Sequence, residues 1–443
     1  MPDRPPYPDF PHEHAYRRSH HRVIHPIVVL CTFGVVGVVG IALLAGGRAP
    51  VADASSSGSR SAARSAITAL SPDASTFGGS ASPSASTPSP LASTPSPSAT
   101  PGPTQTEPVN VYAGTGVGMF APAVAGLPPR VYVPDEQNGT VVVIDPMTFK
   151  IIGRFNVGAS PEHVTPDWDL RRLYADASFS GRLTIIDPLT GRPIGARHVP
   201  SPYNLYFSLD GSKAIVVLDS SVSGTKYSGP KQLYFYDRRT WRLLKALRIP
   251  WAGADHLDFS ADGKFFLLST EYAGYLVKVD VARMAVVKAL DIGGKPVDVR
   301  LSPDGRLFYV ANQGLGGVSI IDPVHMRQLA FLRTGRGAHG LAVSRDARRL
   351  YVTNRRAGTL SVIDFARRHV VATWRIGGTP DMIAVSPDGT QLWISNRYGG
   401  TVSVVSTVNG RVIATIRTGG RPHGLTYFPE PGSFSIGHNG MYR

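Results

Sequence analysis

Imidazole, carboxylate and amide side chains recur at one pair of adjacent positions in this chain, each time directly before a short apolar run. Imidazole nitrogens and carboxylate oxygens bind transition metals and also serve as general acids and bases. Their regular recurrence indicates that the fold places them equivalently, so the elements that carry them must be identified first. The candidate residues at these positions are His163, Asn204, Asp255, His256, Asp298, His339, Asp381 and His423.

The apolar runs belong to a repeat of about 42 residues, which is clearest in Pro296–Gly335. This unit contains four short β-branched and aromatic segments, separated by a Ser-Pro-Asp-Gly turn, a glycine-rich loop and an Asp-Pro turn. Seven copies of the second segment are present. Four strands in each unit of about this length predict an all-β, seven-bladed β-propeller. Two sets of aspartates mark the turns: Asp169, Asp210, Asp262, Asp304, Asp346 and Asp388, and Asp145, Asp187, Asp237, Asp280, Asp322 and Asp364.

The repeats do not begin with a first strand: the first strand of the first blade stands at the end of the chain. The ring opens with strands two to four of one blade, starting at Val131–Val133, and ends with His423–Phe428, which has the pattern of a first strand. We therefore expect the last strand to complete the first blade, which would remove a free sheet edge. The glycine- and proline-rich segment Val109–Pro129 is predicted to lie on the ring as a loop. The segment Pro429–Arg443 is predicted to pack across its bottom or rim.

Several repeat sequences resemble those of the YVTN-repeat, WD40-like β-propellers, and in particular the YncE-like group of bacterial envelopes. They include Tyr351-Val352-Thr353-Asn354, the turn Ser302–Gly305 and Val362–Asp364. The resemblance covers about residues 109–443, and Gly337–Leu341 and Ser435–Gly440 are similar to segments of membrane-tethered members. It implies a seven-bladed propeller outside the cytoplasm, and it implies no particular reaction.

The first strand of each propeller blade lines the central channel, so the recurring polar residues are expected to converge at one mouth of that channel. Such a ring can bind a small polar ligand. Metal binding is left undecided, because a ring tends to hold its side chains too far apart for tetrahedral zinc. In the alternative interpretation these groups hydrogen-bond neighbouring blades and ordered water. No catalytic residue is assigned and no cofactor is expected, because the sequence contains one cysteine and no Cys-x-x-Cys-His motif.

The part of the chain before the repeats divides into three segments. Residues 1–25 are predicted to form a cytoplasmic tail, 26–47 a transmembrane helix and 48–107 a disordered linker rich in Ser, Thr, Pro and Ala. Basic residues precede the uncharged run, which predicts a single-pass protein of the cell membrane with a cytoplasmic N-terminus and an extracytoplasmic propeller. The alternative is a cleaved signal peptide with Ala52-Asp53-Ala54 at the cleavage site. The propeller is assigned to 108–429 and the C-terminal tail to 430–443.

The charge of the repeat region limits the partners. Residues 108–443 contain 39 basic and 25 acidic side chains, an excess of 14. This charge favours an anionic wall polymer, nucleic acid or lipid headgroups as partners, and a protein partner is a further alternative. In another interpretation, the charge only keeps the surface soluble. We expect a binding or scaffold module of the cell envelope rather than an enzyme. The alternatives are a lactonase-type hydrolase that uses the channel-mouth His and Asp residues, and a redox propeller resembling quinoprotein dehydrogenase subunits.

Overall fold

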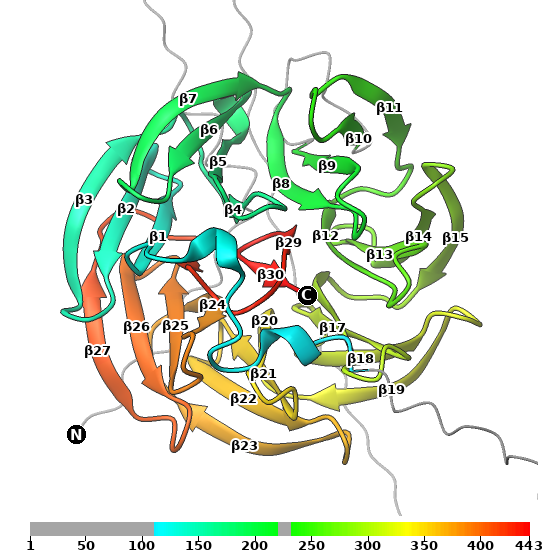
Figure 1. Cartoon of the computed structure of the whole chain (residues 1–443). Coiled ribbons are helices and arrows are strands. Elements are labelled where there is room, and N and C mark those ends of the chain that lie inside the picture. Colours follow the sequence, from blue (N-terminus) through cyan, green and yellow to red (C-terminus); the bar gives the residue numbers. More distant parts are fainter. Residues whose placement is uncertain (1–109, 220–231) are drawn as a thin grey trace, which may run out of the picture. The chain divides into compact units, whose positions relative to one another are not determined.

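A computed structural model of the chain describes residues 110–219 and 232–443. The predicted cytoplasmic tail, transmembrane helix and linker lie outside these residues. No helix within the described ranges is long and apolar enough to cross a membrane. Seven β-sheets surround a central axis, as the sequence predicts (Figure 1).

Each sheet contains one four-stranded antiparallel blade, and the blades are numbered in chain order. Blade 1 consists of β28 (Thr426–Phe428), β1 (Arg130–Asp135), β2 (Thr140–Asp145) and β3 (Lys150–Asn156); blade 2 of β4 (Val164–Pro166), β5 (Leu173–Ala177), β6 (Arg182–Asp187) and β7 (Arg192–His198); blade 3 of β8 (Pro202–Phe207), β9 (Lys213–Leu218), β10 (Gln232–Asp237) and β11 (Leu243–Arg248); blade 4 of β12 (Ala254–Phe259), β13 (Phe265–Thr270), β14 (Tyr275–Asp280) and β15 (Ala285–Asp291); blade 5 of β16 (Pro296–Leu301), β17 (Phe308–Asn312), β18 (Gly317–Asp322) and β19 (Arg327–Arg333); blade 6 of β20 (Ala338–Val343), β21 (Arg349–Asn354), β22 (Thr359–Asp364) and β23 (His369–Arg375); and blade 7 of β24 (Pro380–Val385), β25 (Gln391–Asn396), β26 (Thr401–Ser406) and β27 (Val412–Arg417).

The inner strands of each blade are buried on both faces because neighbouring blades stack against one another. In blade 5, β16 and β17 are buried along their whole length, whereas the outermost strand β19 is largely exposed. Tyr309 and Ile320 of this blade share an apolar cluster with Leu341 and Val352 of blade 6. This packing explains why the second and third strands, such as β17 and β18, are rich in apolar residues on both faces.

The recurring aspartates stabilise turns. Oγ of Ser302 donates a hydrogen bond of 2.5 Å to Oδ1 of Asp304, and Gly305 adopts a φ of 70°, which favours glycine. Asp322 accepts a hydrogen bond from the backbone N–H of Val324 at 2.9 Å and so shapes the turn into β19. Both sets of aspartates therefore have a structural role in the repeat.

The predicted ring closure is confirmed. Strand β28 pairs antiparallel with β1, with Arg130 opposite Phe428 and Tyr132 opposite Thr426. Blade 1 thus combines a C-terminal strand with three N-terminal strands, and its inner edge is fully paired.

The predicted position of the C-terminal tail is wrong. Strands β29 (Ser435–Gly437) and β30 (Met441–Tyr442) form a hairpin inside the ring, and Gly437 of β29 pairs with Tyr206 of β8. Blade 3 thereby becomes a six-stranded sheet. The hairpin, drawn in red, lies at the centre of the ring in Figure 1, so the tail fills the channel from within.

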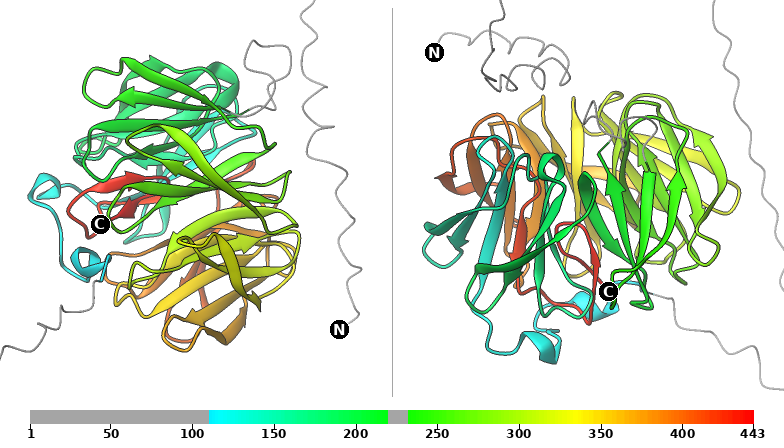
Figure 2. Two further views of the ribbon diagram at one scale, coloured as in Figure 1. Left: turned by 90° about the vertical axis from the view of Figure 1, so that its right-hand side faces the viewer. Right: turned by 90° about the horizontal axis from the view of Figure 1, so that it is seen from above.

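The lead-in segment lies on the ring, as predicted. It contains two 3₁₀ turns, η2 (Ala113–Thr115) and η3 (Pro122–Val124), and a third, η4 (Ser178–Ser180), follows in blade 2. The N–H of Val111 donates to the carbonyl of Pro303 at 2.9 Å, and Phe120 forms a β-bridge with Gly432. The lead-in and the chain terminus therefore lie on the same face of the ring (Figure 2).

Candidate functional site

All eight residues predicted from the sequence lie at or beside the inner strands, and none is more than 4% exposed. The sequence predicts an open channel mouth, whereas the structure shows a buried polar centre. The difference arises from the tail hairpin, which occupies the channel. Ligand binding by these residues stays a prediction.

Two further residues of this centre come from the tail itself. His438 and Asn439 form the turn between β29 and β30, and both are buried with positive φ values of 31° and 35°. Positive φ at both central positions is typical of a tight β-hairpin, for which Asn-Gly is a strong sequence signal. The sequence contains that signal at Asn439–Gly440, but the absence of a 42-residue copy concealed it.

A second ring of residues was also missed, although it has the same period. It consists of the residue that directly follows the second strand of each blade. Because the first two strands of a blade are antiparallel, this position lies at the same end of the blade as the residues before the first strand, and it could have been recognised from its spacing. Its members are Glu136, Ser178, Asp219, Glu271, Gln313, Arg355 and Arg397.

His163, His256 and His438 form a group that we call the tail cluster. One ring nitrogen from each lies within 4.8 Å of those of the other two, and all three side chains are fully buried. The ring centroids are 5.4 Å apart for His163 and His256, and 4.4 Å apart for His256 and His438. The tail therefore supplies the third imidazole of this cluster.

The Nδ1 atom of each imidazole in the tail cluster faces a side-chain oxygen. His163 Nδ1 lies 2.9 Å from Oδ1 of Asn439, and His438 Nδ1 lies 3.0 Å from Oδ1 of Asn204. His256 Nδ1 lies 2.8 Å from Oδ1 of Asp255. The amide oxygens of Asn439 and Asn204 accept hydrogen bonds, so neutral His163 and His438 would be protonated at Nδ1 and would keep a lone pair on Nε2. His256 forms an ion pair with Asp255 when it is protonated.

The tail cluster contains imidazoles with opposite pKa shifts. Burial, reinforced by His256, lowers the pKa of His163 to about 3. Burial also lowers the pKa of His438 well below its usual value. For His256, burial acts in the same direction, but the Asp255 carboxylate outweighs it and raises the pKa above the ordinary value. Two of the three imidazoles are therefore neutral at physiological pH.

His339, Asp381 and His423 form the second group, the arginine cluster. Their ligand atoms also lie within 4.8 Å of one another. Guanidinium groups already occupy them: Arg355 Nη2 lies 2.5 Å from Nε2 of His339, and its Nε donates to Oδ1 of Asp381 at 2.7 Å. Arg397 Nη1 lies 3.2 Å from Nε2 of His423. A fixed cation thus sits where a metal ion would bind.

Charged neighbours dominate the electrostatics of the arginine cluster. Burial first, and then the nearby arginines, lower the pKa values of His339 and His423 well below the usual value. Glu136 accepts from Arg397 at 2.8 Å, and Glu162 contacts Nδ1 of His423 at 2.7 Å. This group is an internally compensated network of ion pairs and hydrogen bonds.

Two of the predicted residues, Asp298 and Asn204, contact neighbouring blades, as the alternative interpretation of the ring predicts. Oδ2 of Asp298 accepts from the N–H of Leu341 in the next blade at 2.8 Å, and its Oδ1 accepts from Arg300 at 2.5 Å. Asn204 Nδ2 contacts the carbonyl of Asp255 in the next blade at 3.5 Å. These side chains connect neighbouring blades around the axis.

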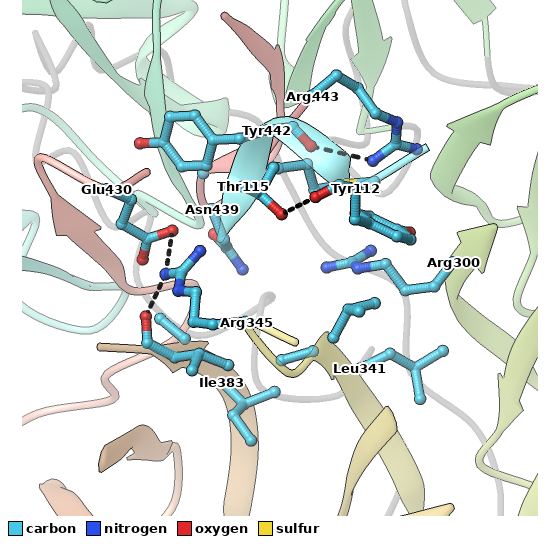
Figure 3. A pocket seen from close by; sticks show the side chains of 16 residues that line it. Tyr112, Thr115, Arg300, Leu341, Arg345, Ile383, Glu430, Asn439, Tyr442 and Arg443 are labelled. Atoms are coloured by element: carbon cyan, nitrogen blue, oxygen red, sulfur yellow. Dashed lines mark hydrogen bonds and ion pairs between the residues drawn. The ribbon is translucent and has the colours of Figure 1, made fainter. Parts of the chain in front are cut away.

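A hollow on the tail side of the ring lies between the lead-in and the hairpin (Figure 3). Arg345 Nη2 lies 3.0 Å from Oε2 of Glu430, and Arg443 Nη2 donates to Asp258 at 2.7 Å. Burial raises the pKa of Glu430 to about 7 in spite of Arg345. Arg300, which also lines the hollow, is paired with Asp298. Each of these arginines thus has a carboxylate partner.

The two ends of the ring differ in how many exposed carboxylates lie among their cations. In an antiparallel blade, the loop between strands two and three lies at the same end as the loop that leads to the next blade. In blade 5, Gly317 at the start of β18 pairs with Arg333 at the end of β19, and both residues lie at this end. The exposed aspartates of the turns, such as Asp304, Asp346 and Asp388, lie at the other end. We call the first end the basic face. It carries a series of exposed cations: Lys295, Arg333, Arg336, Arg356, Arg375 and Arg417.

A family model of YncE-like β-propellers matches residues 117–430. The chain belongs to this family. The matched residues end before the hairpin, so His438 and Asn439 lie outside them. No curated protein matches the sequence significantly.

Solved structures with the same fold come from several bacteria. A functionally unknown protein from Desulfotomaculum acetoxidans superposes with a TM-score of 0.59 at 17% identity, over 67% of this chain and 98% of that one. The periplasmic gluconolactonase of Pseudomonas aeruginosa gives 0.56 at 20% identity, over 68% and 99%. Hydrazine synthase of Kuenenia stuttgartiensis gives 0.53 at 20% identity, over 64% and 97%. At these identities the likeness shows the fold alone.

Proposed function

We propose that this protein is a membrane-tethered, extracytoplasmic binding module that holds an anionic polymer of the cell envelope against its basic face. The observation that carries the proposal is the series of exposed cations at the basic face. The repeat places the turn aspartates at the opposite end, so few exposed carboxylates lie among these cations. A polyanion gains from such a face because neutralising its charges releases counterions.

Aromatic rings support the cations of this face. Lys295 Nζ lies 5.7 Å from the ring centre of Tyr272, and the guanidinium of Arg421 lies 5.7 Å from that of Tyr398. Cation–π contacts of this kind restrain long side chains and keep their charge at the surface. The lactonase alternative has less support, because the His and Asp side chains that it would use are buried.

Binding of the full-length protein to poly(glycerol phosphate) at increasing salt tests this proposal. We expect affinity to fall steeply with salt, with a log–log slope that grows by about 0.7–0.9 for each neutralised phosphate. Replacing Arg333, Arg375 and Arg417 with Gln should reduce that slope by about two to three. The matched control replaces Arg306, Arg348 and Arg411, which are exposed at the aspartate-bearing end, and should change it little. Equal losses in both variants, or no binding at low salt, would contradict the proposal.

The tether is tested separately. Protease added to intact cells should release a propeller fragment cut within residues 48–107, where the sequence predicts an extended linker. A propeller that stays protected until the cells are lysed would argue against an extracytoplasmic location.

A further inference from the structure

We propose that the tail cluster is a metal site, in which His163, His256 and His438 bind one divalent transition metal ion such as Zn²⁺ at the propeller axis. Three converging imidazoles are a ligand set that zinc, copper and nickel prefer. A metal site at the propeller axis goes beyond the proposed binding of a polymer.

The hydrogen bonding of the cluster leaves its metal-facing atoms available. Among the described residues, none donates to or accepts from Nε2 of His163 or Nε2 of His256. Nε2 of His438 has only a 3.5 Å contact with Nδ2 of Asn439 and lies 3.8 Å from Oδ1 of Asp298. Buried polar atoms in folded proteins nearly always have partners. Two unpaired nitrogens within a group of three imidazoles, whose ligand atoms lie within 4.8 Å of one another, therefore point to a missing ligand.

The partners of the Nδ1 atoms have the arrangement that metal-binding histidines require. A metal-bound imidazole usually donates its other N–H to a carboxylate or carbonyl oxygen, which fixes the ring orientation. Asp255, Asn204 and Asn439 supply such oxygens to the three rings at 2.8–3.0 Å. Tetrahedral ligands about 2.1 Å from zinc are about 3.4 Å apart, so nitrogens that lie within 4.8 Å of one another have to approach by at most about 1.4 Å.

The backbone of the tail turn gives independent support. His438 is held at a φ of 31°, where an ordinary L-residue is disfavoured, and its N–H donates to the carbonyl of Leu205 at 2.9 Å. Asn or Gly would form this turn with less strain. A histidine at this position costs stability and gains a third imidazole at the axis, which is expected of a binding residue.

The tail cluster also differs from the arginine cluster in the charged groups that surround it. In the arginine cluster, guanidinium groups contact His339 and His423, whereas no described guanidinium contacts an imidazole of the tail cluster. Asp255 and Asp298 face His256 and His438, and the neighbouring Arg300 is paired with Asp298. The two carboxylates beside the tail cluster favour a bound cation.

Zinc binding by the purified full-length protein, first stripped with EDTA, tests the site. The wild type should bind one tight equivalent, measured by competition with a chelator, and its melting temperature should rise with zinc. His438→Asn keeps a residue suited to positive φ and should bind at least 100-fold more weakly, without the thermal shift. Asp255→Asn keeps all three imidazoles and should weaken binding 10- to 100-fold.

The control for adventitious binding replaces His12, His14, His20, His21 and His25 with Ala, and this variant should keep both the tight equivalent and the thermal shift. Wild-type protein without a tight equivalent would overturn the proposal. Unchanged affinity in both His438→Asn and Asp255→Asn would overturn it as well, because the zinc would then bind elsewhere.

Discussion

The tail cluster and the arginine cluster each contain two histidines from equivalent places in the ring, yet the charged groups beside these histidines differ. In blades 6 and 7 the residue after the second strand is Arg355 or Arg397, and each guanidinium reaches the neighbouring imidazoles. In blade 4 the same position holds Glu271, and the imidazole of that blade faces the tail hairpin instead. One periodic position thus decides whether the axial histidines are compensated from within or remain available to a metal ion.

Removing a guanidinium from the arginine cluster should have the largest effect. Arg355→Met would leave the buried Asp381 without its ion-pair partner, and breaking a buried pair typically costs about 3–5 kcal/mol. Urea denaturation in EDTA should show this loss of unfolding free energy. Zinc should restore part of it and raise the stoichiometry by one, because His339, Asp381 and His423 then form an open site. Unchanged stability would mean that Arg355 is not needed to compensate Asp381.

Adding a guanidinium to the tail cluster is the converse change. Glu271→Arg should place a cation near His256, as Arg355 does near His339, and should weaken zinc binding at least tenfold. Glu271→Gln is the control, since it keeps a polar group beside Gln313, and its zinc affinity should stay within about threefold of the wild type. Equal affinity in the Arg and Gln variants would show that this position does not govern the site.

Zinc binding should weaken at acidic pH because a single proton, bound by His256, competes with the metal. The pKa of His256 is raised above 6.5 by Asp255, whereas the pKa of His163 is about 3 and that of His438 is also lowered. Below the pKa of His256, a proton competes with the metal, so affinity should fall about tenfold per pH unit. Chelator competition between pH 5.5 and 8 measures this slope. A slope of three protons, or none, would contradict the assigned protonation states.

Without metal, the opposite pKa shifts of His163 and His256 should have opposite effects on the pH dependence of the unfolding free energy. These effects should be smaller than those of the changes above. His163 is neutral in the native state but binds a proton near pH 6.5 when unfolded, so its contribution should fall by about 1.4 kcal/mol per pH unit below 6.5. His256 has a raised native pKa, so its contribution is present below pH 6.5 and lost as the pH rises through that pKa.

The unfolding free energies of the wild type and of His163→Gln and His256→Gln, compared at pH 5.5 and 7.5 in EDTA, isolate the two contributions. The difference between wild type and variant should change in opposite directions for the two residues. Changes of the same sign would contradict the opposite shifts.

The fold could be predicted from the sequence because each blade repeats the same local signals. Strand patterns, the turn residues at Ser302–Gly305 and the displaced strand His423–Phe428 predict seven blades and their closure, and the register of β28 with β1 confirms both. The tail hairpin could not be predicted in this way. Its strands are short, it has no second copy, and its position depends on the space that the ring leaves at the axis.

The candidate site could be predicted only in part for the same reason. The period identifies His163, His256 and the other ring residues, since the fold places equivalent positions together. It does not show that Arg355 and Arg397 lie beside two of the imidazoles while His438 lies beside two others. These contacts depend on side-chain reach across blades and on a segment outside the repeat.

Anomalous diffraction at the zinc absorption edge, from crystals of the protein grown with zinc, tests the central claim most directly. The account predicts a peak about 2.1 Å from a ring nitrogen of each of His163, His256 and His438. It predicts no peak among His339, Asp381 and His423, where the guanidinium groups of Arg355 and Arg397 already lie. A peak in the arginine cluster, or a tail cluster without zinc, would contradict it.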